Sequence, residues 1–148
     1  MRTTKIVVVL VLFFATYTLS SSTFAAPPLE NSVSFPAGSL VIPMDEKQAD
    51  RIPVFGFVHA LVRNSIQLFR VIEPPDVTLS TSMTPSPTLF TGGPFLANSA
   101  DTSKVVEVKN RHEFENVTIG TLTTHQILNN IFRVRDPTKI LVVKGLWG

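Results

Sequence analysis

The spacing of apolar residues along this chain predicts strands that alternate with helices. Continuous apolar runs occur at 38–45 and 67–73, and such runs are typical of strands that are buried on both faces. Between them, apolar side chains recur at 54, 57, 58, 61 and 62, which is the spacing of one face of an α-helix. Asp50 and Pro53 favour the start of that helix, as a cap and as a first-turn proline.

The second half of the chain continues the alternation. In order, we expect an irregular stretch at 76–87, two apolar pairs at 88–97 separated by a Gly-Gly-Pro bend, a helix at 102–111 after Asp101, a strand at 117–123, a short helix at 125–132 and a final buried strand at 139–145. The irregular stretch is assigned from its Ser, Thr and Pro residues, which are common in turns and loops.

Alternating strands and helices with continuous apolar runs favour the α/β class, with a small, mainly parallel sheet flanked by helices. Only Leu146, Trp147 and Gly148 follow the last predicted strand, although a helix normally follows such a strand. This favours a truncated doubly wound domain over a complete minimal one. A missing C-terminal segment would leave an apolar sheet face uncovered, and self-association would follow.

The first 25 residues have the pattern of a cleaved export signal. Arg2 and Lys5 precede a wholly apolar run at 6–15, and small polar residues then lead to Ala25. The apolar run is much shorter than the roughly 20 residues of a membrane-spanning helix, which favours cleavage near Ala25 over a retained anchor. We therefore expect a secreted or extracytoplasmic cell-envelope protein with a signal peptide at 1–25, an extended leader at 26–37 and an α/β domain at 38–148.

Removal of the signal changes the charge of the chain. The whole sequence has 13 Lys and Arg against 11 Asp and Glu, and loss of Arg2 and Lys5 leaves 11 of each. The apparent basicity therefore belongs to the signal, and we expect no nucleic-acid partner and no membrane span after cleavage. The sequence has no cysteine, which excludes disulfides, thiol nucleophiles and thiolate metal sites.

Four segments resemble a pattern in uncharacterised secreted proteins of archaea and bacteria. They are GSLVIPMD at 38–45, FGFVHALVR at 55–63, LFRVIEPP at 68–75 and FTGGPFL at 90–96. The layout is also similar to the class I glutamine amidotransferase-like α/β fold. This resemblance implies an α/β fold and a chain that continues past the last strand. It implies no activity, because the catalytic cysteine of that superfamily has no counterpart in this sequence.

The candidate functional residues are those at the carboxyl ends of the predicted strands, where open α/β sheets bind their ligands. Asp45, Glu73 and His125 are the candidates for acid–base or metal chemistry. Gly92 and Gly93, in the bend between two apolar pairs, are the candidates for ligand contact. Each acid or base also has a structural interpretation: a helix cap for Asp45, a solvated strand end for Glu73, and a cap or packing residue for His125.

Other motifs exclude more than they suggest. The sequence has no HExxH motif and no three-ligand cluster, so we expect no metal site and no cofactor. Ser65 and Ser103 lack the G-x-S-x-G elbow of serine hydrolases. His112 stands among charged residues, which favours a surface position. Asn116 begins an Asn-Val-Thr sequon, an N-glycosylation acceptor that matters only in a host that modifies exported proteins.

Together, the export signal, the neutral mature chain and the missing catalytic motifs favour a non-catalytic binding or structural module whose partner is unknown. The alternative is an exported enzyme of unknown class. Its site would lie at the strand ends and would include Asp45 and His125.

Overall fold

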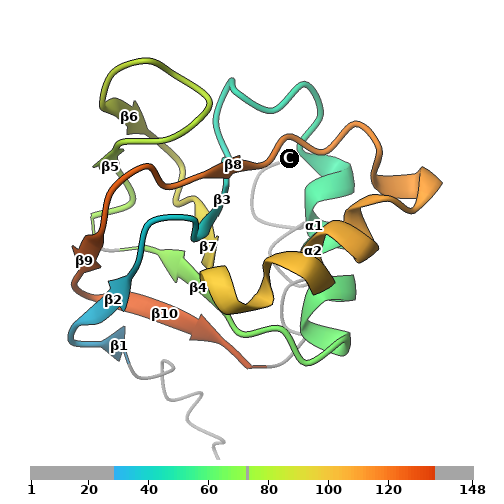
Figure 1. Ribbon diagram of the computed structural model, residues 1–148, viewed down its shortest axis with the longest axis horizontal. Helices are drawn as coiled ribbons and strands as arrows, with labels where there is room; N and C mark the ends of the chain where they lie inside the picture. The colour runs from blue at the N-terminus through green and yellow to red at the C-terminus, as the bar shows by residue number, and fades with distance from the viewer. Residues whose placement is uncertain (1–28, 73, 136–148) are drawn as a thin grey trace, which may run out of the picture.

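The strands of this protein pair antiparallel throughout the part of the chain that the structure describes. The computed structural model describes residues 29–72 and 74–135 (Figure 1). Its elements are β1 (Leu29–Glu30), β2 (Val33–Phe35), β3 (Leu40–Ile42), α1 (Ile52–Arg63), β4 (Leu68–Val71), β5 (Val77–Leu79), β6 (Thr88–Phe90), β7 (Phe95–Ala97), η1 (Ser99–Asp101), α2 (Thr102–Lys109), η2 (His112–Phe114), β8 (Gly120–Thr121), β9 (Gln126–Leu128) and β10 (Ile131–Val134). A six-stranded sheet has the order β1-β10-β4-β7-β3-β8, and β2–β9 and β5–β6 form two further pairs.

The two ends of the described chain form one long antiparallel ribbon. Its pairs run from Leu29 and Phe132 through Val33 and Leu128 to Leu40 and Thr121. Each step forward along β1, β2 and β3 is therefore matched by one step back along β10, β9 and β8. The ribbon bends where Gly38 and Asn130 take left-handed backbone conformations, with φ of 85° and 52°.

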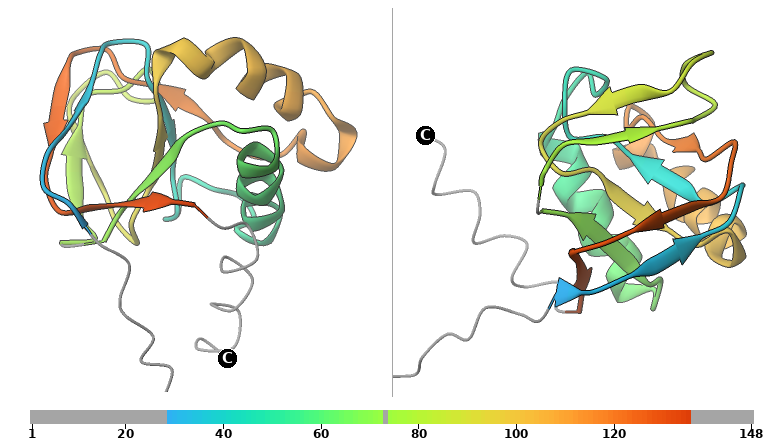
Figure 2. Two further views of the ribbon diagram at one scale, coloured as in Figure 1. Left: turned by 90° about the horizontal axis from the view of Figure 1, so that it is seen from below. Right: turned by 90° about the vertical axis from the view of Figure 1, so that its left-hand side faces the viewer.

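Strands β4 and β7 close this ribbon into a ring. Strand β10 pairs with β4, β4 with β7, and β7 with β3, which returns to the ribbon and pairs with β8. Figure 2 shows the curled sheet, with the blue and red strands of the ribbon side by side. The β5–β6 pair is joined to the ribbon through a bridge between Thr81 and Leu122.

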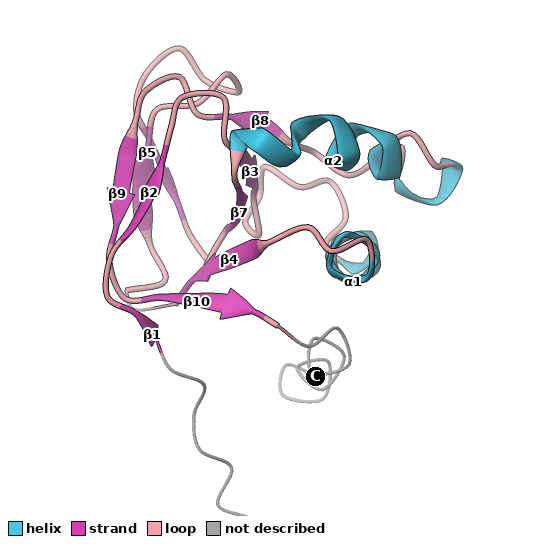
Figure 3. Ribbon diagram, turned by 60° about the horizontal axis from the view of Figure 1, so that its bottom comes forward, coloured by secondary structure: helices cyan, strands magenta, loops and turns pink. Residues whose placement is uncertain are grey.

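Both helices lie on one side of the curled sheet, and β2, β9 and β5 lie on the other (Figure 3). Helix α1 begins beside Asp50, whose Oδ1 accepts a hydrogen bond from Ile52 N at 2.9 Å. Helix α2 buries Val105 and Val108, as predicted. The buried residues of α1 belong to its predicted apolar stripe: Val54, Phe57, Val58 and Leu61. The predictions of these two helices are therefore confirmed.

The continuous apolar runs are explained by burial on both faces of the sheet. In β3, Leu40 and Ile42 pack in one apolar cluster with the helices, whereas Val41 belongs to a second cluster with residues of the β5–β6 pair and the ribbon. Strand β7 repeats this alternation, because Leu96 joins the second cluster and its two neighbours join the first. A strand between two apolar layers is apolar at every position, whatever the direction of its neighbours.

The predicted mainly parallel sheet and the doubly wound layout are therefore wrong. Strands β3 and β4 do point the same way and are connected by α1, but β7 lies between them and is antiparallel to both. The apolar runs indicate that both faces of a strand are covered, and they carry no information about strand direction. Here the helices cover one face, and the β5–β6 pair and the ribbon cover the other.

Four local predictions also need correction. The predicted helix at 125–132 is wrong, since β9 and β10 occupy it and Asn130 bends the chain between them. The stretch at 76–87 contains β5, and the strand predicted at 117–123 is limited to β8, with Leu122 in the bridge to Thr81. Residues 29–35, assigned to the leader, form β1 and β2. The predicted signal at 1–25 and final strand at 139–145 lie outside the described residues.

Candidate functional site

Asp45 follows β3 and is buried, with its side chain 1% exposed. Its Oδ1 accepts a hydrogen bond from Lys47 N at 3.1 Å. Its Oδ2 accepts one from Thr91 N and one from Lys47 Nζ, both at 2.9 Å. The carboxylate therefore ties the end of β3 to the segment between β6 and β7. Asp45 is not a helix cap, because the first amide of α1, Ile52 N, donates its hydrogen bond to Asp50 Oδ1.

Lys47 forms an ion pair with Asp45 and also contacts the segment at 89–90. Its Nζ also donates to Leu89 O at 3.0 Å and lies 4.8 Å from the centroid of the Phe90 ring. Burial by itself would raise the pKa of Asp45, but the hydrogen bonds from Thr91 and Lys47, and the Lys47 charge, outweigh burial and lower that pKa below its usual value. Asp45 is therefore held as a carboxylate whose two oxygens both accept hydrogen bonds from the fold, which is unsuited to a general acid or base.

Gly92 and Gly93 form the bend beside this ion pair, with φ of 73° and 72°. A Cβ atom on Gly92 would stand 3.2 Å from Met44 O. A Cβ atom on Gly93 would collide with the carbonyl oxygen of Val71. Both glycines are therefore required by the backbone conformation and by the close approach of neighbouring strands, and these requirements are independent of any ligand.

Arg70 on β4 holds the same bend, and sequence reasoning did not identify it. Its Nε donates to Gly93 O at 3.3 Å and its Nη2 to Gly92 O at 3.4 Å. The guanidinium also stacks on Phe95, with Cζ 5.2 Å from the ring centroid. Burial lowers the pKa of Arg70. The available signal was a lone arginine inside the apolar segment Leu-Phe-Arg-Val-Ile.

His125 belongs to the ribbon and has a different partner. It is exposed, and its Nε2 lies 2.7 Å from Ser34 Oγ. Among the hydrogen bonds of the described residues, this is the one that involves the His125 side chain. The carboxylate of Asp45 accepts its hydrogen bonds from Lys47 and Thr91, so the side chains of the two candidates do not share a bonded network. Glu73, the third candidate, lies outside the described residues.

Two further residues singled out in the sequence lie at the surface. Asn116 is exposed in a turn after η2, a position that a glycosylating enzyme could reach. His112 has a side chain 92% exposed, with Nδ1 3.2 Å from Glu115 Oε2. Within the ranges 29–72 and 74–135, no group of three or more His, Cys, Asp or Glu residues is placed to hold a metal ion.

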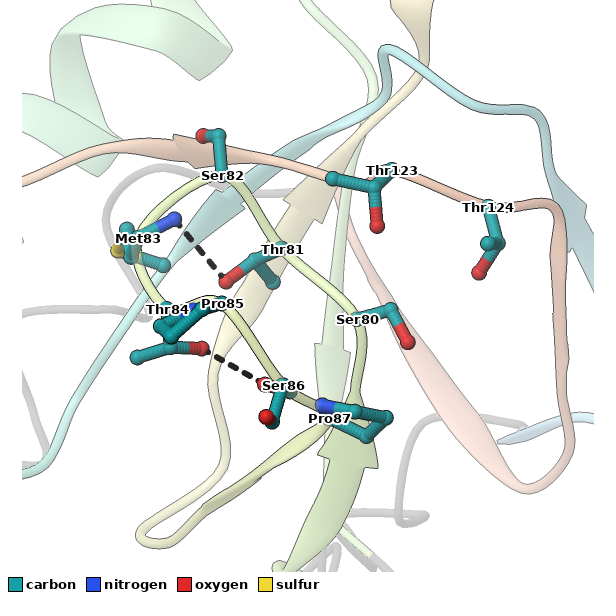
Figure 4. Close-up of a pocket in the computed structure, with 10 residues that line it drawn as sticks. All are labelled: Ser80, Thr81, Ser82, Met83, Thr84, Pro85, Ser86, Pro87, Thr123 and Thr124. Atoms are coloured by element: carbon teal, nitrogen blue, oxygen red, sulfur yellow. Dashed lines mark hydrogen bonds between the residues drawn. The ribbon is translucent and has the colours of Figure 1, made fainter.

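An open pocket of about 520 Å³ lies between the loop after β5 and the segment after β8 (Figure 4). Its lining residues are Ser80, Thr81, Ser82, Met83, Thr84, Pro85, Ser86, Pro87, Thr123 and Thr124. Seven of these ten carry hydroxyl groups and none is charged, so the pocket offers polar contacts without a charge. The Ser, Thr and Pro residues at 76–87 predict an irregular stretch and supply most of the lining hydroxyls. The sequence does not indicate that Thr123 and Thr124 lie opposite them.

Comparisons with family models, with curated proteins and with solved structures give no match. The resemblance to secreted archaeal and bacterial proteins therefore stays a prediction. Among the described residues, neither helix has the length and apolar character needed to cross a lipid bilayer.

Proposed function

We propose that this protein is an exported, non-catalytic binding or structural module that acts outside the cytoplasm or in the cell envelope. The observation that carries this proposal is the state of Asp45, the candidate acid whose surroundings are fully described. Its carboxylate is buried and bonded to Lys47 and Thr91, so it holds two segments of the fold together. Export is supported by the charged, apolar and small-residue pattern of residues 1–25.

The pocket beside Thr123 supports binding more than chemistry. Catalytic sites for acyl, glycosyl or phosphoryl transfer need an acid, a base, a nucleophile with its base, or a metal. The described residues that line this pocket provide hydroxyl groups and apolar surface but no carboxylate, imidazole or amine. Such a lining can recognise a ligand by hydrogen bonds and shape.

The test is a turnover assay of the exported protein on a panel of ester, glycoside and peptide substrates. We expect no turnover above that of a preparation from cells that lack the gene. Turnover that co-purifies with the protein, and that a substitution in this chain abolishes without a loss of thermal stability, would contradict the proposal.

The alternative, an exported enzyme of unknown class, is favoured by one contact. Ser34 Oγ and His125 Nε2 are 2.7 Å apart, which is the distance expected between a nucleophile and its base. A fluorophosphonate probe, which phosphonylates activated serines, distinguishes the two functions. Labelling that disappears in both Ser34→Ala and His125→Asn, but persists in the control Ser86→Ala, would favour the enzyme.

A further inference from the structure

We infer that the hydroxyl-lined pocket between 80–87 and 123–124 binds a neutral saccharide. This inference rests on the proposed binding function, and it names the class of ligand. Figure 4 shows the hydroxyl groups of Ser80, Thr123 and Thr124 in the space between the loop and the ribbon segment.

The lining hydroxyls fall into two groups. Those of Thr81, Ser82 and Thr84 hold the loop in place: Thr81 Oγ1 accepts from Met83 N and Thr84 Oγ1 donates to Ser86 O within the loop, and Ser82 Oγ accepts from Thr121 N on β8. The hydroxyls of Ser80, Ser86 and Thr123 make no hydrogen bond with any other described residue, and those of Ser80 and Thr123 face the space between the loop and the ribbon segment, where a ligand can reach them (Figure 4). Thr124 Oγ1 accepts from Gln126 Nε2, which leaves its own proton to donate.

The loop that carries these groups is firmly attached to the ribbon. Ser82 N donates to Thr121 O at 2.8 Å, and Thr123 N donates to Ser80 O at 3.0 Å. Met83 packs directly on Gly120, where even one added methyl group would overlap its side chain. A site whose backbone is held before the ligand arrives loses less entropy on binding.

The absence of charge in the lining decides against an ionic ligand. A charged group that enters a pocket loses hydration, and a neutral lining returns too little of that free energy. A saccharide carries hydroxyl groups that both donate and accept, as do the free hydroxyls of Ser80 and Thr123. Its C–H surfaces match the exposed rings of Pro85 and Pro87. The volume of about 520 Å³ lies in the range of small-ligand sites.

The experiment is an NMR titration of the exported full chain with cellobiose and maltose, and with the acidic disaccharide digalacturonate as the charged comparison. We expect the neutral disaccharides to shift the amide resonances of 80–87 and 123–124, and digalacturonate to shift them less. The double variant Ser80→Ala/Thr123→Val should weaken binding about tenfold or more, because each lost hydroxyl leaves a ligand hydroxyl unpaired. Thr78→Val, an exposed threonine on β5 outside the lining, is the matched control and should bind like wild type.

Two outcomes would overturn the inference, and a third would overturn the proposed function. Equal or stronger binding of digalacturonate at the pocket would show a charged ligand, and the proposed binding function would stand. No shift at these residues with either neutral disaccharide, in protein that melts cooperatively, would remove the pocket as a saccharide site. Hydrolysis of a disaccharide during the titration, lost in the double variant, would instead overturn the proposed non-catalytic function.

Discussion

Replacing Asp45 with Asn should be one of the most damaging isosteric changes in the described chain. The substitution keeps the shape of the side chain but removes its charge and one of its two acceptor oxygens. Oδ2 receives hydrogen bonds at 2.9 Å from both Thr91 N and Lys47 Nζ. A hydrogen bond to a charged group contributes about 1.5–3 kcal/mol, and breaking a buried ion pair costs about 3–5 kcal/mol.

We expect Asp45→Asn to lower the free energy of unfolding by about 3 kcal/mol, at the lower end of that range. The reason is that Lys47 has a side chain 18% exposed and keeps its bond to Leu89 O, so its ammonium group can still reach water. For a domain of this size, such a loss corresponds to a fall in Tm of about 10 °C. Glu46→Gln is the matched control, because Glu46 also faces Lys47, at 3.9 Å, but its side chain is 85% exposed. It should change stability by less than about 0.5 kcal/mol.

The pH dependence follows from the lowered pKa of Asp45 in the folded protein. The ionised carboxylate stabilises the fold, so its contribution is fully present above the unfolded pKa, near 3.8, and is lost as the pH falls through the folded pKa. Urea unfolding followed by circular dichroism measures this directly. The difference between wild type and Asp45→Asn should be constant around neutral pH and shrink below about pH 4. An Asp45→Asn variant as stable as Glu46→Gln, or a difference in stability that does not shrink in acid, would show that the Asp45 carboxylate does not stabilise the fold.

The remaining predictions concern the backbone, one buried hydroxyl and the signal. Gly93→Ala should lower the free energy of unfolding by more than about 3 kcal/mol, because its methyl group would collide with the Val71 carbonyl. Gly38→Ala has room for its methyl group and should lower the free energy of unfolding by about 1–2 kcal/mol, the cost of the left-handed conformation. Equal losses in urea unfolding would contradict the predicted collision. Ser39 is fully buried and its Oγ has no partner among the described residues, so Ser39→Ala should be neutral or stabilise by about 1 kcal/mol in the same assay; a clear loss would show that the hydroxyl is bonded. The intact mass of the exported protein should correspond to a chain that begins at Ala26, and a mass that includes residues 1–25 would indicate a retained anchor.

Sequence patterns predicted the helices better than they predicted the sheet. The stripe at 54, 57, 58 and 61 reports one buried helical face, and α1 buries these residues. In β3, by contrast, the run Leu40-Val41-Ile42 reports only that both faces are covered. Strand direction depends on residues far away in sequence, such as the pairing of β3 with β7 and β8, and no local pattern encodes it. The apolar spacing at 125–132 is compatible with a helix, but the segment forms β9 and β10 because it pairs with β1, β2 and β4.

Some of the predicted site residues lie together in the structure, but they are not assembled as the prediction assumed. Asp45 and the two glycines do lie together, because Thr91 N bonds to Asp45 and the bend follows directly. The prediction assumed strands whose carboxyl ends share one edge, and in an antiparallel sheet that edge does not exist. His125 therefore came to lie beside Ser34 instead. Arg70 and the hydroxyl-lined pocket were missed because their roles depend on distant partners, such as Gly93 and Thr123.

The constant register of β1–β3 with β8–β10 has a consequence for how the chain matures. Ser34 and His125 are 91 positions apart, so the first strands find their partners only after nearly the whole described chain has left the ribosome. During synthesis, the segment that directly follows the proposed export signal stays without its partner strand. On the proposed route, the protein would reach the export machinery with its ring still open, in the unfolded form that a translocation channel accepts. Closure of the ring would then take place on the far side of the membrane, as the last step of folding.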